Sequence, residues 1–213
     1  MDKVAELKAL ETEIAARRDL PLMESNLVFG EGNINCDVMF IGEAPGVNED
    51  RLKRPFVGRG GQLLDQVVQG IGWKREQVYI SNIVKRRPPE NRDPLPAEIE
   101  AYKPYLTRQI EIINPRVVVT LGRFSMNYFL PFAKITNDHG RVFNVDGRLV
   151  YPVYHPAAAL RSTTMMNTFR DDIKKLPKVL AGELTVEMPT AIAMPEAMAK
   201  PKKKEKPKQP GLF

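Results

Sequence analysis

Cysteine is almost absent from this chain: Cys36 is the only one in 213 residues. A disulfide framework is therefore excluded, and so is a metal site built entirely from the cysteines of one chain. No apolar run reaches the length of a membrane span and no signal-peptide pattern is present, so we expect a cytoplasmic protein. The Gly-x-Gly-x-x-Gly turn and the P-loop are also missing, which argues against a generic nucleotide-binding protein.

The positive charge is concentrated at one end of the chain. The formal net charge is +6, from 32 Lys and Arg against 26 Asp and Glu. Residues 200–208 hold six lysines and one glutamate, so they contribute +5 of that excess. A nucleic-acid surface on the rest of the chain must therefore come from local arrangement. We expect one domain at residues 1–181 and a disordered Lys/Pro-rich tail at residues 182–213.

One long connection organises the rest of the sequence. Residues 38–41 are four apolar residues followed by glycine, which predicts a short buried strand. A helical pattern begins near Gly61, about twenty residues later. Connections from a strand to a helix usually run only a few residues. This one carries carboxylates, a phenylalanine and several glycines, and such a loop is where an open α/β sheet binds its ligand.

Apolar runs alternate with helical patterns along the chain. We expect strands at residues 38–41, 78–83, 117–122 and 149–154. We expect helices at residues 1–18, 61–70, 96–114, 123–130 and 168–181. This alternation predicts a three-layer α/β/α fold around a central four-stranded, mainly parallel sheet. The polar or glycine residues at the carboxyl ends of these strands should meet at one edge: Glu43, Asn82, Gly122 and His155.

Five segments in unbroken order resemble the motifs of the uracil-DNA glycosylase superfamily. They are Gly42-Glu43-Ala44-Pro45-Gly46, Pro55-Phe56-Val57-Gly58-Arg59, Val78-Tyr79-Ile80-Ser81-Asn82-Ile83-Val84-Lys85, Arg87-Pro88-Pro89-Glu90-Asn91-Arg92 and His155-Pro156-Ala157-Ala158-Ala159-Leu160-Arg161. The resemblance is to family 4, a bacterial and archaeal group, and it covers roughly residues 1–180. It implies a DNA-repair enzyme that flips uracil out of DNA and hydrolyses its N-glycosidic bond, leaving an abasic site.

The resemblance assigns a pocket to Ala44, Phe56 and Asn82, and its chemistry agrees with their side chains. Phe56 offers an aromatic face on which a flipped base can stack. The Asn82 amide can donate to a carbonyl and accept from a ring N–H, which suits uracil and mismatches cytosine. His155 matches the motif histidine that donates a hydrogen bond to uracil O2 as negative charge builds there. The plainer alternatives are a turn asparagine, a core phenylalanine and a structural histidine.

Two carboxylates join His155 as candidate catalytic residues. Other branches of the superfamily place an aspartate where this chain has Ala44, and family 4 commonly has a small residue there. Glu43 is then the candidate for positioning the attacking water and stabilising the cationic sugar. Glu49 matches a family position that lines the pocket near the place a thymine methyl would occupy, and its role there is steric or electrostatic.

The resemblance also implies contacts to single- and double-stranded DNA by a monomeric protein. Leu160 and Arg161 lie where the family inserts a loop into the duplex, and an apolar wedge there would help to extrude the base. Lys85, Arg87 and Arg92 belong to a basic, proline-rich loop suited to phosphate contacts.

The chain departs from family 4 in its cysteines. Members of that family usually bind an iron–sulfur cluster through four cysteines, and the matching positions here are Ala15, Arg18, Arg86 and Tyr102. Such clusters need thiolates, so we expect no cluster and no other cofactor. The replacing side chains could fill the space by packing or by pairing with acids such as Glu98 or Glu100.

Other readings of the fold lead to different functions. A non-catalytic DNA-binding or polymerase-processivity module could keep the fold, but it would not need Phe56, Asn82 and His155 together. A related branch forms a covalent adduct with uracil-DNA through a histidine in the arginine-rich loop, and residues 85–89 contain no histidine.

The chain ends in Gln209-Pro210-Gly211-Leu212-Phe213. Glutamine followed by two spacers and two apolar residues resembles the short peptide by which bacterial repair and replication proteins bind the sliding clamp. Gln209, Leu212 and Phe213 are therefore candidate partner-binding residues, and the lysine-rich segment before them would be a tether that attracts DNA and keeps the protein near the nucleoid.

Overall fold

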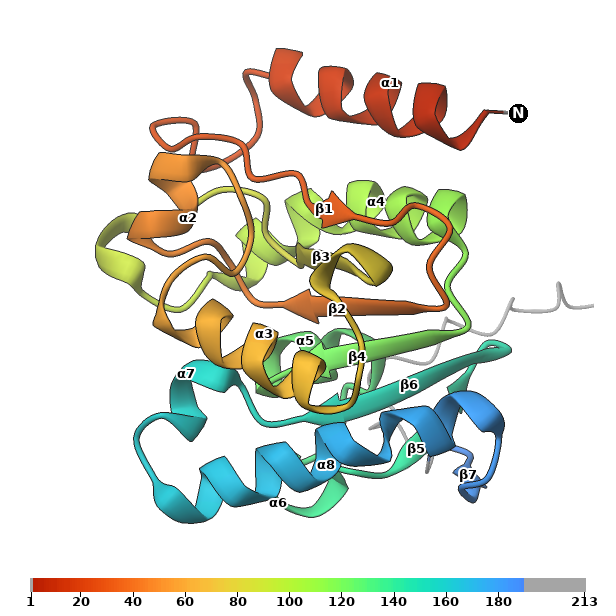
Figure 1. Cartoon of the computed structure of the whole chain (residues 1–213). Helices are drawn as coiled ribbons and strands as arrows, with labels where there is room; N and C mark the ends of the chain where they lie inside the picture. Colours follow the sequence, from red (N-terminus) through yellow and green to blue (C-terminus); the bar gives the residue numbers. More distant parts are fainter. Residues whose placement is uncertain (1, 190–213) are drawn as a thin grey trace, which may run out of the picture.

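The computed structural model describes residues 2–189 and contains a central sheet between two layers of helices (Figure 1). Four parallel strands form the middle of the sheet in the spatial order β3-β2-β4-β6. Their bounds are Tyr79–Asn82 (β3), Val38–Gly42 (β2), Val117–Leu121 (β4) and Arg148–Val153 (β6). These are the four strands predicted from the sequence, and the three-layer α/β/α fold is confirmed.

The sheet is larger than the four strands predicted, because short strands extend it on both sides. It has seven strands in the order β1-β3-β2-β4-β6-β5-β7. The added strands are Glu31–Gly32 (β1), Val142–Val145 (β5) and Val186–Glu187 (β7). The predicted hairpin turn at Asp146 and Gly147 joins β5 to β6, with φ of 51° and 83° at its two central residues. β7 lies beyond the predicted boundary at residue 181 and pairs with β5 in the same sheet.

Alternate residues of the strands face the two helical layers. Val38 and Phe40 of β2 pack with α3 (Arg59–Gly70) and α8 (Thr163–Ala181) in one apolar core. Met39 and Ile41 point the other way, into a second core built with α1 (Lys3–Ala16) and α4 (Pro96–Ile113). The period of two in a strand thus divides each strand between two cores. Figure 1 shows the two pairs of helices on opposite sides of the sheet.

Side-chain caps set the helix boundaries. Asp2 accepts a hydrogen bond from the Val4 amide at 3.0 Å and begins α1. Ser162 accepts one from the Met165 amide and begins α8 five residues earlier than the predicted start at residue 168. Gly182, with φ of 74°, ends α8 in the left-handed conformation that glycine adopts without strain.

The long connection after β2 contains a helix that the sequence pattern did not predict. This helix is α2 (Val47–Leu52), and none of its residues is buried. The shorter elements are η1 (Arg75–Gln77), η2 (Pro89–Asn91), α5 (Arg123–Phe129), α6 (Ile135–Asp138) and α7 (Pro156–Ala159). Within residues 2–189, no helix combines the length and apolar character needed to cross a membrane.

Candidate active site

The carboxyl ends of the four parallel strands deliver the predicted residues to one edge of the sheet. Phe56 and Asn82 meet around Gly42, the last residue of β2, and His155 lies on another strand-end loop beside the Phe56 ring and Gly122. A Cβ atom on Gly42 would lie 2.4 Å from Cζ of Phe56 and 2.5 Å from Oδ1 of Asn82. The ring centroids of Phe56 and His155 are 5.8 Å apart. Only glycine at the end of β2 leaves room for this arrangement.

Asn82 presents an unsatisfied acceptor. Its side chain is 1% exposed, and Oδ1 has no hydrogen-bond partner. A buried polar atom without a partner costs about 1–3 kcal/mol. A ligand with an N–H group directed at Oδ1 would recover that energy.

His155 is the N-cap residue of α7, and this position fixes its tautomer. Nδ1 accepts a hydrogen bond from the Ala157 amide at 3.1 Å, so Nδ1 carries no proton. Burial lowers the pKa of His155 to about 4; the negative charge of Glu49 opposes this shift and the positive charge of Arg161 adds to it. At neutral pH the imidazole is therefore uncharged, and its one proton is on Nε2. His155 is therefore an uncharged hydrogen-bond donor beside Phe56.

Glu43 follows the end of β2 and is partly buried. Burial and the nearby charge of Asp93 raise the pKa of Glu43 to about 7, against a smaller lowering by Arg123. A carboxylate with a pKa near the working pH can take a proton from water efficiently. Ala44 lies next to it and packs against the core shared by α1 and α4.

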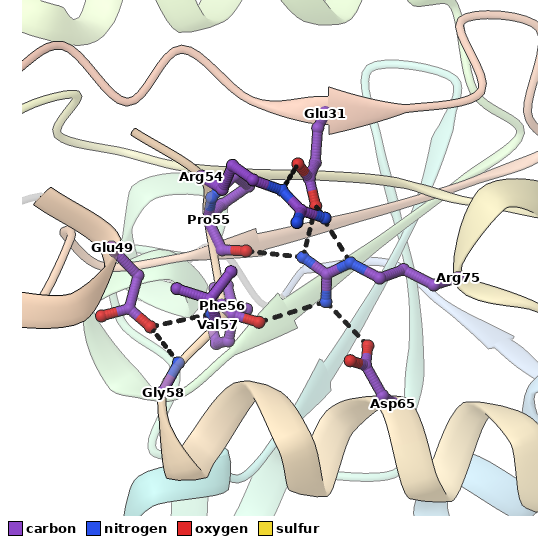
Figure 2. A network of polar contacts seen from close by, with 9 residues as sticks. All are labelled: Glu31, Glu49, Arg54, Pro55, Phe56, Val57, Gly58, Asp65 and Arg75. Carbon is purple, nitrogen blue, oxygen red and sulfur yellow. Dashed lines mark hydrogen bonds and ion pairs between the residues drawn. The ribbon is translucent and has the colours of Figure 1, made fainter. Parts of the chain in front are cut away.

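Glu49 is committed to the backbone of the long connection. Its Oε1 accepts hydrogen bonds from the amides of Val57 and Gly58, at 2.9 and 2.6 Å (Figure 2). These amides belong to the start of α3, where a negative charge is favoured. Glu49 thus holds the segment that follows Phe56 through that oxygen.

Arg75, which the sequence pattern did not single out, holds the other side of the same segment (Figure 2). Its guanidinium donates to the carbonyl oxygens of Pro55 at 2.5 Å and Phe56 at 3.1 Å. It also pairs with Glu31 at 2.8 Å and Asp65 at 2.7 Å. Arg75 comes from the turn before β3 and matches none of the five motifs, so no sequence signal marks it.

Phe56 needs this support because its backbone is left-handed, with φ of 50°. That conformation is unfavourable for a residue with a side chain. Gly61 accommodates the resulting turn, since a Cβ there would lie 1.9 Å from the Phe56 carbonyl oxygen. Hydrogen bonds of Glu49 and Arg75 with the backbone around Phe56 therefore fix the position of its aromatic ring.

The prediction that Lys85 contacts DNA phosphate is wrong. Lys85 is fully buried, and Nζ donates to Ser81 Oγ and Gln109 Oε1, both at 2.6 Å. Burial also lowers the pKa of Lys85 to about 7. The lysine turns inward because β3 and α4 place these two acceptors in the core.

The other predicted DNA contacts lie at the surface to different degrees. Leu160 is 38% exposed and Arg161 is exposed, just beyond α7. Arg87 is partly buried and donates to Asn91 at 2.7 Å. Arg92 is exposed but forms a two-pronged ion pair with Glu98, at 2.6 and 2.8 Å. Its charge is therefore already compensated in the free protein.

The residues at the four cluster positions do not fit an iron–sulfur cluster, because none supplies a thiolate. Among residues 2–189, no group of three His, Cys, Asp or Glu side chains could hold a metal ion. Of the two alternatives for the replacing side chains, packing or pairing with acids, the structure shows no pairing with Glu98 or Glu100, since these acids pair with Arg92 and Lys103. Instead, Tyr102 is buried and donates to the Pro21 carbonyl oxygen at 2.7 Å, and Arg86 donates to the Ser25 carbonyl oxygen.

Comparison with known proteins gives a consistent family assignment. A family model described as "Uracil DNA glycosylase superfamily" matches residues 29–176. A type-4 uracil-DNA glycosylase of Sulfurisphaera tokodaii is 42% identical in an alignment that covers 80% of this chain and 83% of that protein. A protein of the same name from Saccharolobus solfataricus is 45% identical over 74% of this chain and 78% of its own length. Another, from Archaeoglobus fulgidus, is 42% identical over 74% of this chain and 84% of its own length. The chain therefore belongs to the uracil DNA glycosylase superfamily.

Proposed function

We propose that this protein is a DNA-repair glycosylase that flips uracil out of DNA, hydrolyses its N-glycosidic bond and leaves an abasic site. The observation that carries the proposal is the unpartnered Oδ1 of Asn82 together with the neutral, Nε2-protonated His155. The ring of Phe56 is close to both, at Gly42 for Asn82 and 5.8 Å from the His155 ring, so we place the acceptor, the donor and the ring around one flipped base.

Recognition follows from the hydrogen-bonding pattern of the base. Uracil stacks on Phe56, its N3–H donates to Asn82 Oδ1, and its O4 accepts from the same amide. Cytosine offers an acceptor at N3 and a donor at position 4, so both contacts would be mismatched. A flipped cytosine would leave the Asn82 oxygen buried and unpaired.

Hydrolysis breaks the bond between C1′ of the sugar and N1 of uracil, and the electron pair leaves with the base. Negative charge then builds on uracil O2, where His155 Nε2–H donates a hydrogen bond. Water attacks C1′ and gives up its proton to the Glu43 carboxylate, whose pKa of about 7 suits that role. The departing uracil anion then takes up a proton from solvent and Glu43 releases its own, so the products are free uracil and an abasic deoxyribose. No step requires a metal or nucleotide cofactor.

The surface residues around the pocket are proposed to hold DNA. Leu160 would enter the stack as the flipped base leaves it, and Arg161, Arg87 and Arg92 would contact phosphates. For Arg92 this requires exchange of its Glu98 partner for a phosphate. We assign the protein to the cytoplasm, as a monomer acting on single- and double-stranded DNA.

The test is incubation with a uracil-containing oligonucleotide, followed by alkaline cleavage of abasic sites. Wild-type protein should cut the strand at uracil. Asn82→Ala and His155→Ala should each lose at least about two orders of magnitude in rate, as when a preorganised donor is removed from an oxyanion site. Absence of wild-type activity on every uracil substrate would reject the enzyme and favour the non-catalytic DNA-binding or processivity module.

The C-terminal peptide Gln209-Pro210-Gly211-Leu212-Phe213 lies outside the described residues, and sliding-clamp binding is proposed from its sequence alone. Attachment to the clamp would raise the local concentration of enzyme near newly made DNA. Deleting residues 209–213 should abolish clamp binding in a titration and leave excision from short oligonucleotides unchanged. Equal clamp binding by the full-length and shortened proteins would disprove the assignment.

A further inference from the structure

A cavity of about 520 Å³ lies outside the pocket formed by Phe56, Asn82 and His155. It is bounded by the second half of α1, the segment after it, the residue that ends α2, and the loop after β3. Its lining is Lys8, Glu11, Thr12, Ala15, Arg18, Met23, Glu24, Ser25, Asn26, Leu27, Lys53 and Arg86. Figure 1 shows the end of α1 and all of α2 on the side of the molecule where β2 and β3 end.

The lining has more cations than it can pair. It contains four cationic side chains and two carboxylates, and one of those carboxylates, Glu11, pairs with Lys8 at 3.1 Å. Arg18 and Lys53 are exposed and form no salt bridge within residues 2–189. The neighbouring Arg17, in contrast, pairs with Asp19 at 2.5 Å. The cavity therefore keeps an excess of positive charge.

Arg86 gives the cavity an unsatisfied donor. This arginine is 6% exposed, and Nη1 donates to the Ser25 carbonyl oxygen. Its Nε is buried and has no acceptor, and no carboxylate pairs with the guanidinium in the part of the chain that the structure describes. A buried cation without an anion is costly. An anion with several oxygen atoms in the cavity would compensate this charge.

Two short chain segments connect the cavity to the proposed uracil pocket. Arg86 follows Asn82 by four residues, on the loop that leaves β3. Lys53 precedes Phe56 by three residues, on the long connection after β2. A DNA strand whose base occupies the pocket would thus bring a neighbouring phosphodiester near the cavity.

We propose that this cavity binds a backbone phosphate of the DNA strand that carries the flipped nucleotide. Arg86 is its buried anchor, and Arg18 and Lys53 are the exposed cations that complete it. The proposal rests on the proposed function, because the pocket sets which strand passes the cavity. Packing alone does not require an arginine at position 86, and the proposal gives this residue a role in binding.

The test compares charge-removing variants in DNA binding. The probe is a duplex oligonucleotide with a tetrahydrofuran abasic-site analogue, which the protein can bind but not cleave, followed by fluorescence anisotropy at several salt concentrations. Arg18→Gln/Lys53→Gln removes two exposed charges and should preserve folding, which urea unfolding checks. The control, Lys74→Gln/Lys178→Gln, removes two exposed lysines from the turn before β3 and the last turn of α8, away from the edge that carries the pocket.

Each phosphate contact contributes about 0.9 to the slope of log K against log salt on duplex DNA. The Arg18/Lys53 variant should lose up to about 0.9 from the slope magnitude and bind up to roughly eightfold more weakly at about 0.1 M salt. The Lys74/Lys178 control should match wild type. An Arg18/Lys53 variant whose slope equals that of the control would overturn the proposal, whatever the outcome for uracil excision.

Inorganic phosphate, titrated by calorimetry, separates a DNA site from a site for small anions. Phosphate binding that the Arg18/Lys53 variant loses, together with an unchanged DNA slope, would overturn the DNA assignment. Uracil excision by wild-type protein is measured separately. A protein that shows the slope change but cuts no uracil substrate would keep the phosphate site and reject the glycosylase.

Discussion

Replacing Arg75 with lysine should loosen the segment that presents Phe56 and keep the positive charge in place. The guanidinium donates to two backbone carbonyls, of Pro55 and Phe56, and pairs with two carboxylates. A lysine ammonium has no planar fork and cannot reach all four acceptors. Each hydrogen bond from a charged donor contributes about 1.5–3 kcal/mol. Loss of the two carbonyl contacts therefore removes at least about 2 kcal/mol, after allowance for water reaching the carbonyls.

That loss is comparable to the strain it opposes. The left-handed backbone of Phe56, with φ of 50°, costs about 1–2 kcal/mol. Without Arg75 the segment should relax, and Phe56 should no longer hold the position needed for stacking. Stacking of a base on an aromatic ring contributes about 1–3 kcal/mol. We therefore expect kcat/KM for uracil excision to fall about 10–100-fold in Arg75→Lys, at roughly tenfold per 1.4 kcal/mol.

The assay is single-turnover excision, with stability followed by urea unfolding and with Arg54→Gln as the matched control. Arg54 pairs with the same Glu31 but donates to neither carbonyl, so its variant should keep kcat/KM. If Arg75 acts through Phe56, adding Arg75→Lys to Phe56→Ala should cost little more activity. The reasoning is refuted if the two losses multiply, or if Arg75→Lys loses stability but keeps kcat/KM within about twofold.

Three further predictions follow from the same site and from the core beneath it. Glu43 must be ionised to accept a proton, and its pKa is about 7, so kcat/KM should rise with pH and level off above about pH 7. Asp93→Asn should lower the pKa of Glu43 and move this rise to lower pH. An unmoved midpoint would exclude Glu43 as the base. The pKa of Lys85 is about 7 in the folded protein and has its ordinary value in the unfolded chain, so the unfolded chain binds more protons between pH 7 and 10. The free energy of unfolding should therefore increase with pH in that range, by up to about 1.4 kcal/mol per pH unit. Urea unfolding of Lys85→Met should lack this pH dependence, and a dependence equal to that of wild type would contradict the assignment. Gly42→Ala should fold but lose excision, because its Cβ would lie 2.4 Å from the Phe56 ring, and full activity would show that the ring is not needed where it lies.

The four central strands could be predicted because buried parallel strands require continuous apolar runs. Residues 38–41 are such a run, residues 117–121 are one interrupted only by Thr120, and all of them are buried. The strands β1 and β7 have two residues each, which is too short for any period to show. Helix α2 was missed for a related reason: it buries no residue, so no hydrophobic stripe marks it.

Among the candidate site residues, those at strand ends were placed correctly, since parallel strands bring their carboxyl ends to one edge. Glu43, Asn82 and His155 reach that edge as predicted. Arg75 could not be predicted, because its role depends on carbonyl groups twenty residues away in sequence. Lys85 could not be placed either, because Gln109, the acceptor that draws it inward, belongs to another element.

Asn82 and Lys85 show what separates a functional polar residue from a structural one in this fold. Both come from β3 or its first extension, and both are buried. Lys85 is satisfied by Ser81 and Gln109, so its burial needs no ligand. Asn82 Oδ1 has no partner, and Arg86 Nε is another of the three unpartnered side-chain atoms buried within residues 2–189. Asn82 Oδ1 belongs to the proposed uracil pocket and Arg86 to the lining of the proposed phosphate cavity, so for these two residues we propose that bound DNA supplies the missing partner.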